Sequence, residues 1–167
     1  MTATVYIAFG SNLEDRRAHI EKALSALERL ATGPMNVSSL WQSAPVDMDP
    51  DTSWFLNGVV AFETELAPRL LLSALQSIER AGGRPADHGR NQPRRIDLDI
   101  ICMGDLIVDD ADLQLPHPRA GERRFVLAPL AEIAPDLVFP GESKTVEKLL
   151  TLAPDMAIRR VSDARDA

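Results

Sequence analysis

Apolar positions along the chain alternate between the spacing of a strand and the spacing of a helix. The continuous apolar run at residues 5–9, which ends at Gly10, predicts a short buried strand. Apolar side chains then recur every three or four residues from 20 to 30 and predict a helix, which the Gly-Pro pair at 33–34 ends. Asn12 is the predicted N-cap of that helix, because an Asn side chain can accept a hydrogen bond from an unpaired N–H of the first turn.

The same alternation continues through the middle of the chain. Residues 37–43, 55–63, 95–103 and 106–108 carry strand-like apolar patterns. A helical pattern begins at Pro68 and runs to Gly82-Gly83. The resulting order is strand, helix, strand, strand, helix, strand, which is the ferredoxin-like arrangement. We therefore expect an α+β fold in which helices pack on a mainly antiparallel sheet, and in which the C-terminal residues add further strands and helices.

Length and composition are those of one soluble globular domain. The chain has 167 residues, of which 45% are hydrophobic and 26% charged, so we expect a single domain over residues 1–167 with a frayed tail at 162–167. The N-terminal residues lack the pattern of a signal peptide, and no apolar run is long enough to cross a bilayer. The expected location is cytoplasmic, without membrane contact. The single cysteine, Cys102, excludes an internal disulfide and a cysteine-based zinc site.

The net charge of −7 argues against a general nucleic-acid-binding protein, which usually carries a basic face. We therefore expect small-molecule partners and a monomeric protein. The arginines are nevertheless concentrated in two stretches, at residues 80–95 and 119–124. A guanidinium group can bind phosphate or carboxylate in a bidentate way, so these stretches indicate a phosphate-binding site. A solvated, arginine-rich face explains them equally well.

Two aspartates interrupt the predicted strand at residues 95–103, in the sequence RRIDLDII. Because strand side chains alternate, Asp97 and Asp99 project from one face, with Cα atoms roughly 6.5 to 7 Å apart, while Leu98 and Ile100 face the core. Mg²⁺ commonly takes one or two carboxylates together with substrate phosphates. Beside the arginines, the pair therefore indicates a phosphoryl-transfer site, whereas by itself it would also suit a solvated hairpin face.

Aromatic side chains form a second candidate feature, because they make up only 5% of the chain. The candidates are Trp41, Trp54, Phe55 and Phe125. Three of them flank the loop at residues 44–53, and with the amide of Asn57 they are suited to hold and hydrogen-bond a flat heterocycle. A place in the core is an equally good interpretation for both phenylalanines, and it is the better one for Trp41. Phe55 follows a long acidic loop at residues 44–53, whose length favours a functional role.

A histidine and a glycine-rich loop are further candidates. His117 lies between two prolines in LPHPR, which hold its backbone extended near Arg119 and Arg123, where it can donate to a phosphate oxygen. A structural or surface role is more usual for a lone histidine. The loop at residues 82–93 could close over a nucleotide, although its composition slightly favours a plain surface connection. The chain has no nucleotide-binding fingerprint, and Ser11 has no evident partners for a catalytic triad.

The stretch PRRIDLDII at residues 93–101 closely resembles the signature of the hydroxymethyldihydropterin pyrophosphokinase family of the folate pathway. Supporting matches follow in order along nearly the whole chain. They are YIAFGSNL (6–13), FLNGVV (55–60), LQSIER (75–80), LPHPR (115–119) and ERRFVLAPLAEIAPDLVFP (122–140). So many matches in the same order argue against coincidence.

The resemblance implies transfer of diphosphate from ATP, the co-substrate, to the 6-hydroxymethyl group of the dihydropterin, with release of AMP and with two Mg²⁺ ions as cofactors. By position, Asp97 and Asp99 are implied to hold the metals, and Arg84 and Arg94 to be the mobile, phosphate-directed arginines. The implied ATP side consists of Gln76, Glu79, Arg94, Ile100, His117 and Arg123. The implied pterin pocket, in which Phe55 and Phe125 stack on the ring, consists of Ser43, Ala44, Val46, Phe55, Asn57, Asp97 and Phe125.

Two other functions explain part of the sequence. Another two-metal enzyme, a nucleotidyltransferase, would need a paired-acid motif shortly after Gly10-Ser11, and the stretch RRAHIEKAL does not offer one. A non-catalytic ferredoxin-like ligand-binding module would explain the fold and a pocket. It would not explain two acids in register beside a phosphate-directed arginine loop.

Overall fold

The computed structural model describes residues 2–12, 15–44, 54–82 and 96–161. Within these ranges, no helix combines the length and the apolar character needed to span a membrane. The elements in chain order are β1 (Ala3–Ser11), α1 (Arg16–Glu28), β2 (Asn36–Val37), β3 (Trp41–Ser43), β4 (Phe55–Thr64), α2 (Pro68–Ala81), β5 (Asp97–Met103), β6 (Val108–Asp109), β7 (Gln114–Leu115), the short 3-10 helix η1 (Ala120–Glu122), α3 (Arg124–Ile133), α4 (Val146–Leu152) and β8 (Ile158–Arg160).

The main sheet has six strands, and all of its pairings are antiparallel. Five strands lie in the order β5-β1-β4-β3-β8, and β2 also pairs with β4. β1 therefore lies between β4 and β5, as the ferredoxin-like arrangement requires, and the predicted α+β fold is confirmed. The C-terminal part adds β8 beside β3, while β6 and β7 form a separate two-stranded sheet.

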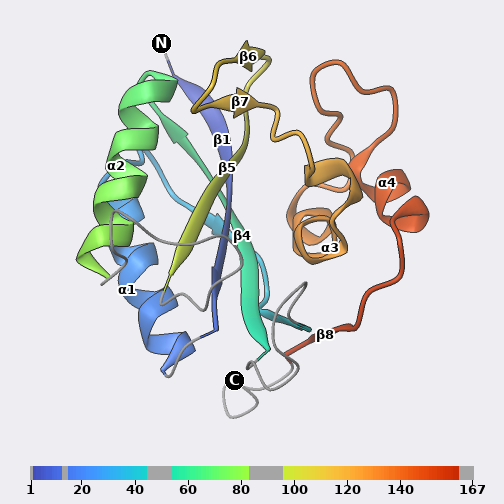
Figure 1. The fold of residues 1–167 in the computed structure, drawn as a ribbon. Coiled ribbons are helices and arrows are strands. Elements are labelled where there is room, and N and C mark those ends of the chain that lie inside the picture. The colour runs from blue at the N-terminus through green and yellow to red at the C-terminus, as the bar shows by residue number, and fades with distance from the viewer. Residues whose placement is uncertain (1, 13–14, 45–53, 83–95, 162–167) are drawn as a thin grey trace.

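The sheet separates two layers of helices (Figure 1). α1 and α2 cover one face, and α3 and α4 lie against the other. The alternation along β1 matches these layers: Val5, Ile7 and Phe9 enter the core beneath α1 and α2, whereas Tyr6 and Ala8 pack with α3 and α4. Because β1 is covered on both faces, its sequence is continuously apolar rather than alternating.

The first helix begins later than its predicted cap. Asn12 is buried directly after the end of β1, and Asp15 is the residue that precedes α1. Asp15 has a left-handed backbone, with φ of 58°, and its side chain makes no capping hydrogen bond. The prediction of Asn12 as the N-cap is therefore wrong, because α1 begins only at Arg16, and Asp15 is the residue before it.

The strand predicted at residues 37–43 is two short strands, β2 and β3. Ser38 follows the first of them, and its Oγ accepts the backbone N–H of Val59 at 2.9 Å. The same hydroxyl donates to the carbonyl oxygen of Ser39 at 2.8 Å. A side chain thus replaces part of the strand ladder, which explains why the single predicted strand forms two strands.

The strand predicted at residues 106–108 is also displaced. Gly104, with φ of 54°, opens a turn that the sequence predicted, but the following strand, β6, begins only at Val108. Ile107 is 69% exposed, so the apolar pattern of this stretch does not reflect burial. Apolar side chains on a surface turn are common, and here they resembled a strand.

Three predicted features lie wholly or largely outside the described residues. They are the tail at 162–167, most of the acidic loop at 44–53 and nearly all of the loop at 82–93. The strand predicted at 95–103 is present as β5, whose first residue is Asp97.

Candidate active site

The aspartate pair on β5 has the orientation that strand pleating requires. Asp97 and Asp99 are half-buried, whereas Leu98 and Ile100 are buried in the core beneath α1 and α2. Asp99 lies opposite Ala8 of β1, which packs with α3 and α4. Because residues directly opposite each other share a face of the sheet, both carboxylates project from the α3 face.

A buried carboxylate on α2 supports the strand between the two aspartates. Oε2 of Glu79 accepts the backbone N–H of Leu98 at 2.9 Å, and Glu79 is only 9% exposed. β5 is an outer strand of the sheet, so an N–H that points outward needs a partner other than a strand. Glu79 therefore holds the segment that carries Asp97 and Asp99.

Two buried polar residues, Asn57 on β4 and Ser43 on β3, lie on the same sheet as Asp97, with β1 between β4 and the Asp97 strand. Trp41, Asn57, Gly10 and Asp97 form one row across four adjacent strands, in that order. The amide nitrogen of Asn57 donates to Oγ of Ser43 at 2.6 Å, and the two residues are 5% and 2% exposed. This buried hydrogen bond fixes the orientation of the Asn57 amide relative to the Asp97 strand.

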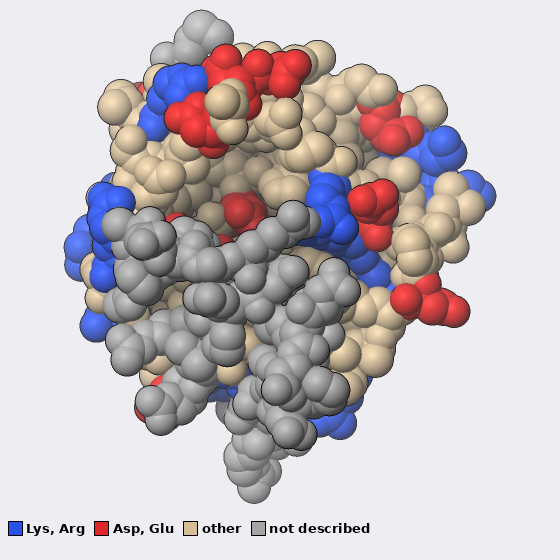
Figure 2. Space-filling model, in the orientation of Figure 1, with Lys and Arg blue, Asp and Glu red and all other residues tan. Residues whose placement is uncertain are grey.

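The α3 side of the site is basic. Arg123, directly before α3, interacts electrostatically with Asp99 and Asp97, and its guanidinium carbon lies 5.6 Å from the ring centroid of Phe125. Burial lowers the pKa of Arg123, Arg119 lowers it further, and the aspartates oppose both effects. Arginine remains cationic because its ordinary pKa is so high. Figure 2 shows acidic atoms at the base of a hollow, with basic groups along one border.

His117 is held beside these groups as a neutral hydrogen-bond donor. Its backbone N–H donates to the carbonyl oxygen of Ile101 on β5 at 2.7 Å, and its Nδ1 accepts the N–H of Arg119 at 3.2 Å. Burial lowers the pKa of His117 to about 4, with smaller effects of Arg123 and Arg119 in the same direction and of Asp97 in the opposite one. With Nδ1 as an acceptor, the neutral ring carries its proton on Nε2.

Asp97 and Asp99 fit Mg²⁺ in the chemistry of their donor atoms. Over the described ranges, no group of three or more His, Cys, Asp or Glu side chains is placed to hold a metal ion. Both aspartates supply carboxylate oxygens, which are the hard ligands that Mg²⁺ prefers. Sites in which substrate phosphates complete the coordination commonly use only one or two carboxylates, so the pair suits such a site.

The aromatic candidates are half-buried. Phe55 pairs with Ser43 across β3 and β4, and Phe125 lies in the first turn of α3, which packs against β4. Trp41 is also half-buried, and its Nε1 donates to Oε1 of Glu132 on α3 at 2.6 Å. The interpretation of Trp41 as a core residue is therefore wrong, because its indole N–H needs a polar partner and finds one near the surface.

The other residues predicted for the ATP side and the pterin pocket contribute less to the arrangement around Asp97 and Asn57. Gln76 is exposed on α2, and the side chain of Ile100 is in the core, so only the main chain of Ile100 can meet a ligand. The N–H of Ala44 donates to the carbonyl oxygen of Ala157 at 3.0 Å, which ties the end of β3 to the C-terminal segment. Val46, Arg84 and Arg94 lie outside the described residues.

Two residues differ from what their sequence context indicated. Arg124, part of the second basic stretch, donates to the carbonyl oxygens of Ala153 at 2.7 Å and Pro154 at 3.2 Å, so it anchors the segment after α4. Gly10 lies inside β1 rather than at its end, beside the amide of Asn57. Its signal was available in the sequence, since a glycine within a strand often marks close approach of a ligand.

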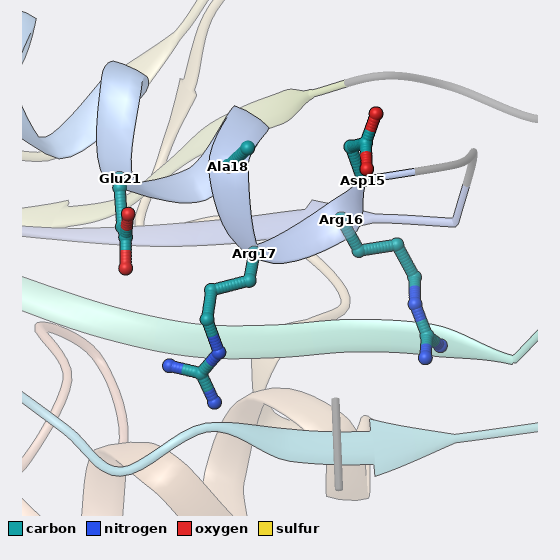
Figure 3. A pocket seen from close by; sticks show the side chains of 5 residues that line it. All are labelled: Asp15, Arg16, Arg17, Ala18 and Glu21. Carbon is teal, nitrogen blue, oxygen red and sulfur yellow. The ribbon is translucent and has the colours of Figure 1, made fainter. Parts of the chain in front are cut away.

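A hollow at the start of α1 is separate from these residues. It is lined by Asp15, Arg16, Arg17, Ala18 and Glu21. Figure 3 shows the side chains of both arginines extending to one side of the helix and that of Asp15 to the other. None of the residues predicted to bind substrate lines this hollow.

The fold is shared with solved structures. A crystal structure of HPPK-DHPS in complex with substrates matches 91% of this chain with a TM-score of 0.68 and 13% sequence identity. Wild-type HPPK-DHPS of Plasmodium falciparum with pteroate matches 91% of this chain with a TM-score of 0.69 and 15% identity. The chain spans 43% and 42% of the length of these proteins, and at such identities the likeness concerns the fold.

Two curated relatives are much more similar in sequence to this chain than these solved structures are. The 2-amino-4-hydroxy-6-hydroxymethyldihydropteridine pyrophosphokinase of Pseudomonas aeruginosa is 44% identical over 165 residues, which cover 98% of this chain and 100% of the relative. The enzyme of the same name from Methylorubrum extorquens is 43% identical over 160 residues, covering 93% and 97%. The family model of 7,8-dihydro-6-hydroxymethylpterin-pyrophosphokinase (HPPK) matches residues 6–135. The chain belongs to the HPPK family.

Proposed function

We propose that the chain transfers diphosphate from ATP to the 6-hydroxymethyl group of 6-hydroxymethyl-7,8-dihydropterin, a step of folate biosynthesis that yields AMP and the pterin diphosphate. The observation that carries the proposal is the row in which the fixed amide of Asn57 and the carboxylate of Asp97 share one face of the sheet. Family membership supports it, because the relatives with 44% and 43% identity are named as pyrophosphokinases of the hydroxymethyldihydropteridine.

The pterin lies, in this proposal, on the α3 face above β3 and β4. The amide of Asn57 offers both a donor and an acceptor to the polar edge of the ring, and Ser43 keeps that amide in place. Phe55 and Phe125 pack on the flat faces of the heterocycle. The proposed pocket consists of Ser43, Ala44, Val46, Phe55, Asn57, Asp97 and Phe125.

ATP lies beside β5, with its phosphates between the aspartates and the basic groups before α3. Nε2–H of His117 donates to a phosphate oxygen, and Arg123 contributes positive charge that is already close to Asp97 and Asp99. Arg84 and Arg94 neutralise further phosphate charge. The proposed ATP side consists of Gln76, Glu79, Arg94, Ile100, His117 and Arg123.

Asp97 and Asp99 would hold two Mg²⁺ ions, which supply neutralisation of phosphate charge when bound. In the reaction, the hydroxyl oxygen of the pterin bonds to the β-phosphorus of ATP. The bond from that phosphorus to the oxygen shared with the α-phosphorus breaks, this oxygen leaves with AMP, and the hydroxyl proton passes to water. Phosphoryl transfer requires mainly alignment and charge stabilisation, so the chain contributes positioning by its rigid strands.

The test is product analysis with the purified chain, ATP, Mg²⁺ and the hydroxymethyl dihydropterin. We expect AMP and pterin diphosphate in equal amounts, and we expect Asp97→Asn to lower kcat by at least about 100-fold without changing the fold. Asp105→Asn, at an exposed position in the turn after β5, is the matched control. Release of pyrophosphate would indicate a nucleotidyltransferase, and binding without AMP would indicate a ligand-binding module; either result contradicts the proposal.

A further inference from the structure

Gly10 occupies an unusual place for a glycine. It lies within β1, is buried, and pairs with Asn57 of β4 on one side and Asp97 of β5 on the other. A glycine inside a strand weakens the strand, because it has more conformational freedom to lose and no side chain to pack. The atoms around the position that a Cβ would occupy therefore indicate why a glycine is present at residue 10.

A Cβ added at Gly10 would point at the proposed pterin pocket. It would lie 2.9 Å from Oδ1 of Asn57 and 3.7 Å from Cδ1 of Phe55. The Asn57 amide cannot easily withdraw, because its nitrogen donates to the buried hydroxyl of Ser43 at 2.6 Å. Even a methyl group at this position must therefore displace the amide or bend β1.

A second strand glycine shows that this environment is specific to Gly10. Gly58 lies one residue after Asn57 in β4, and a Cβ there would lie 2.3 Å from Cζ of Phe9. Phe9 belongs to the core beneath α1 and α2, on the opposite face of the sheet. Gly58 thus makes room for a core side chain, whereas Gly10 leaves room beside an amide and a ring of the site.

The positions of Asn57, Gly10 and Asp97 on adjacent strands indicate what the space above Gly10 is for. Strands lie about 4.8 Å apart, so Asn57 and Asp97, with Gly10 between them, have backbones about 10 Å apart. A ligand whose polar edge meets the Asn57 amide, and whose reacting group meets Asp97, must cross the backbone of Gly10. Ala8, the next residue of β1 on this face, packs with α3 and α4, so Gly10 is where the strand surface passes from core to site.

We propose that Gly10 is a specificity-determining residue for the pterin. Its missing side chain lets the hydroxymethyl-bearing part of the ring lie directly on β1 between the Asn57 amide and the Asp97 carboxylate. The inference rests on the proposed function and the pterin pocket assigned there. It predicts that the first carbon added at residue 10 impairs pterin binding selectively.

The experiment measures steady-state kinetics of AMP formation for Gly10→Ala, the Kd of the pterin with a non-hydrolysable ATP analogue, and Tm. We expect the KM and Kd of the pterin to rise at least tenfold, with the KM of ATP within twofold of the unmodified chain. Gly33→Ala is the control for alanine substitution as such, because a Cβ there would meet nothing within 4 Å. Gly58→Ala is the control for a packing clash, and we expect it to lower Tm without a selective effect on the pterin.

A companion variant separates two routes of action. In an Asn57→Ala background there is no amide to displace, so Gly10→Ala should still weaken the pterin if its methyl group occupies the path of the ligand. Unchanged pterin constants in Gly10→Ala, or constants for pterin and ATP that worsen together with Tm, would overturn the inference. Loss of the pterin effect in the Asn57→Ala background would overturn it as well, since Gly10 would then act only through the amide.

These outcomes remain distinct from a failure of the proposed function. If the unmodified chain forms no AMP, the function itself is wrong. If AMP forms but Asn57→Ala leaves the Kd of the pterin unchanged, the pocket assignment is wrong. If both hold and Gly10→Ala is neutral, only the role of Gly10 is wrong.

Discussion

Replacing Glu79 tests whether α2 supports the aspartate-bearing strand through a main-chain hydrogen bond. Glu79→Ala removes the acceptor of the Leu98 N–H, which lies at 2.9 Å in a buried position. A hydrogen bond to a charged group contributes roughly 1.5–3 kcal/mol, and a buried donor left unpaired costs roughly 1–3 kcal/mol. We therefore expect a loss of about 2–3 kcal/mol in the free energy of unfolding.

The conservative variant separates the hydrogen bond from the charge. Glu79→Gln keeps a carbonyl oxygen on a side chain of the same length, so it can still accept the Leu98 N–H, and we expect a loss of only about 1 kcal/mol. For a chain of this size, 1 kcal/mol shifts Tm by about 2–4 °C, so Glu79→Ala should melt about 4–12 °C lower. In Glu79→Ala the strand that carries Asp97 is freed at one point, and kcat should fall by up to about 100-fold.

The assay is urea denaturation followed by circular dichroism, paired with kcat and KM from AMP formation. Ser73→Ala, at an exposed position on the same helix, is the control and should stay within about 0.5 kcal/mol of the unmodified chain. If Glu79→Gln is as unstable as Glu79→Ala, the charge and not the hydrogen bond supports the strand. If Glu79→Ala is as stable and active as the control, the support does not exist.

Four further outcomes follow from the same geometry. Arg124→Ala loses two hydrogen bonds to carbonyl oxygens, so it should lower the free energy of unfolding by about 1–3 kcal/mol and leave the KM values unchanged. Arg123→Ala should have the opposite pattern: the KM of ATP should rise about tenfold, with little change in Tm. The pKa of His117 is lowered from 6.5 to about 4, so between these values the unfolded chain binds more protons than the folded chain. The free energy of unfolding should therefore rise between pH 4 and pH 6.5, and this rise should be complete above pH 6.5. Urea denaturation over the same pH range should show a smaller rise for His117→Asn than for the unmodified chain. Asp99→Asn should raise the Mg²⁺ concentration needed for half-maximal AMP formation, and an unchanged Mg²⁺ dependence would contradict the metal assignment.

Features that depend on local sequence were predicted well. The start of α2 at Pro68 was predicted, and its end at Ala81 lies directly before the glycine pair that was expected to end it. A proline at the first helical position and a periodic apolar stripe both act within the segment. The common face of Asp97 and Asp99 followed from strand pleating in the same way. Such features need no knowledge of what packs against them.

Features that depend on distant residues were not predictable by spacing. Whether Asn12 caps a helix depends on where β1 ends, and the break between β2 and β3 depends on a hydrogen bond from Val59 to Ser38. The pairing of Glu79 with Leu98 joins residues 19 positions apart, and no periodicity encodes it. These contacts form only when the sheet has assembled, so their signals are absent from any single segment.

The two faces of β1 show how one strand can serve both the core and the site. On the face beneath α1 and α2, the side chains are large from Val5 through Ile7 to Phe9. On the other face they become smaller along the chain, from Tyr6 through Ala8 to Gly10. Tyr6 and Ala8 pack with α3 and α4, so a smaller residue there would leave a cavity, whereas a larger residue at Gly10 would meet the Asn57 amide. The decrease in side-chain size therefore lets β1 be rigid where it is packed and leaves its backbone uncovered at Gly10, where the pterin is proposed to lie. The rigidity of the packed part holds the Asn57 amide and the aspartates in register.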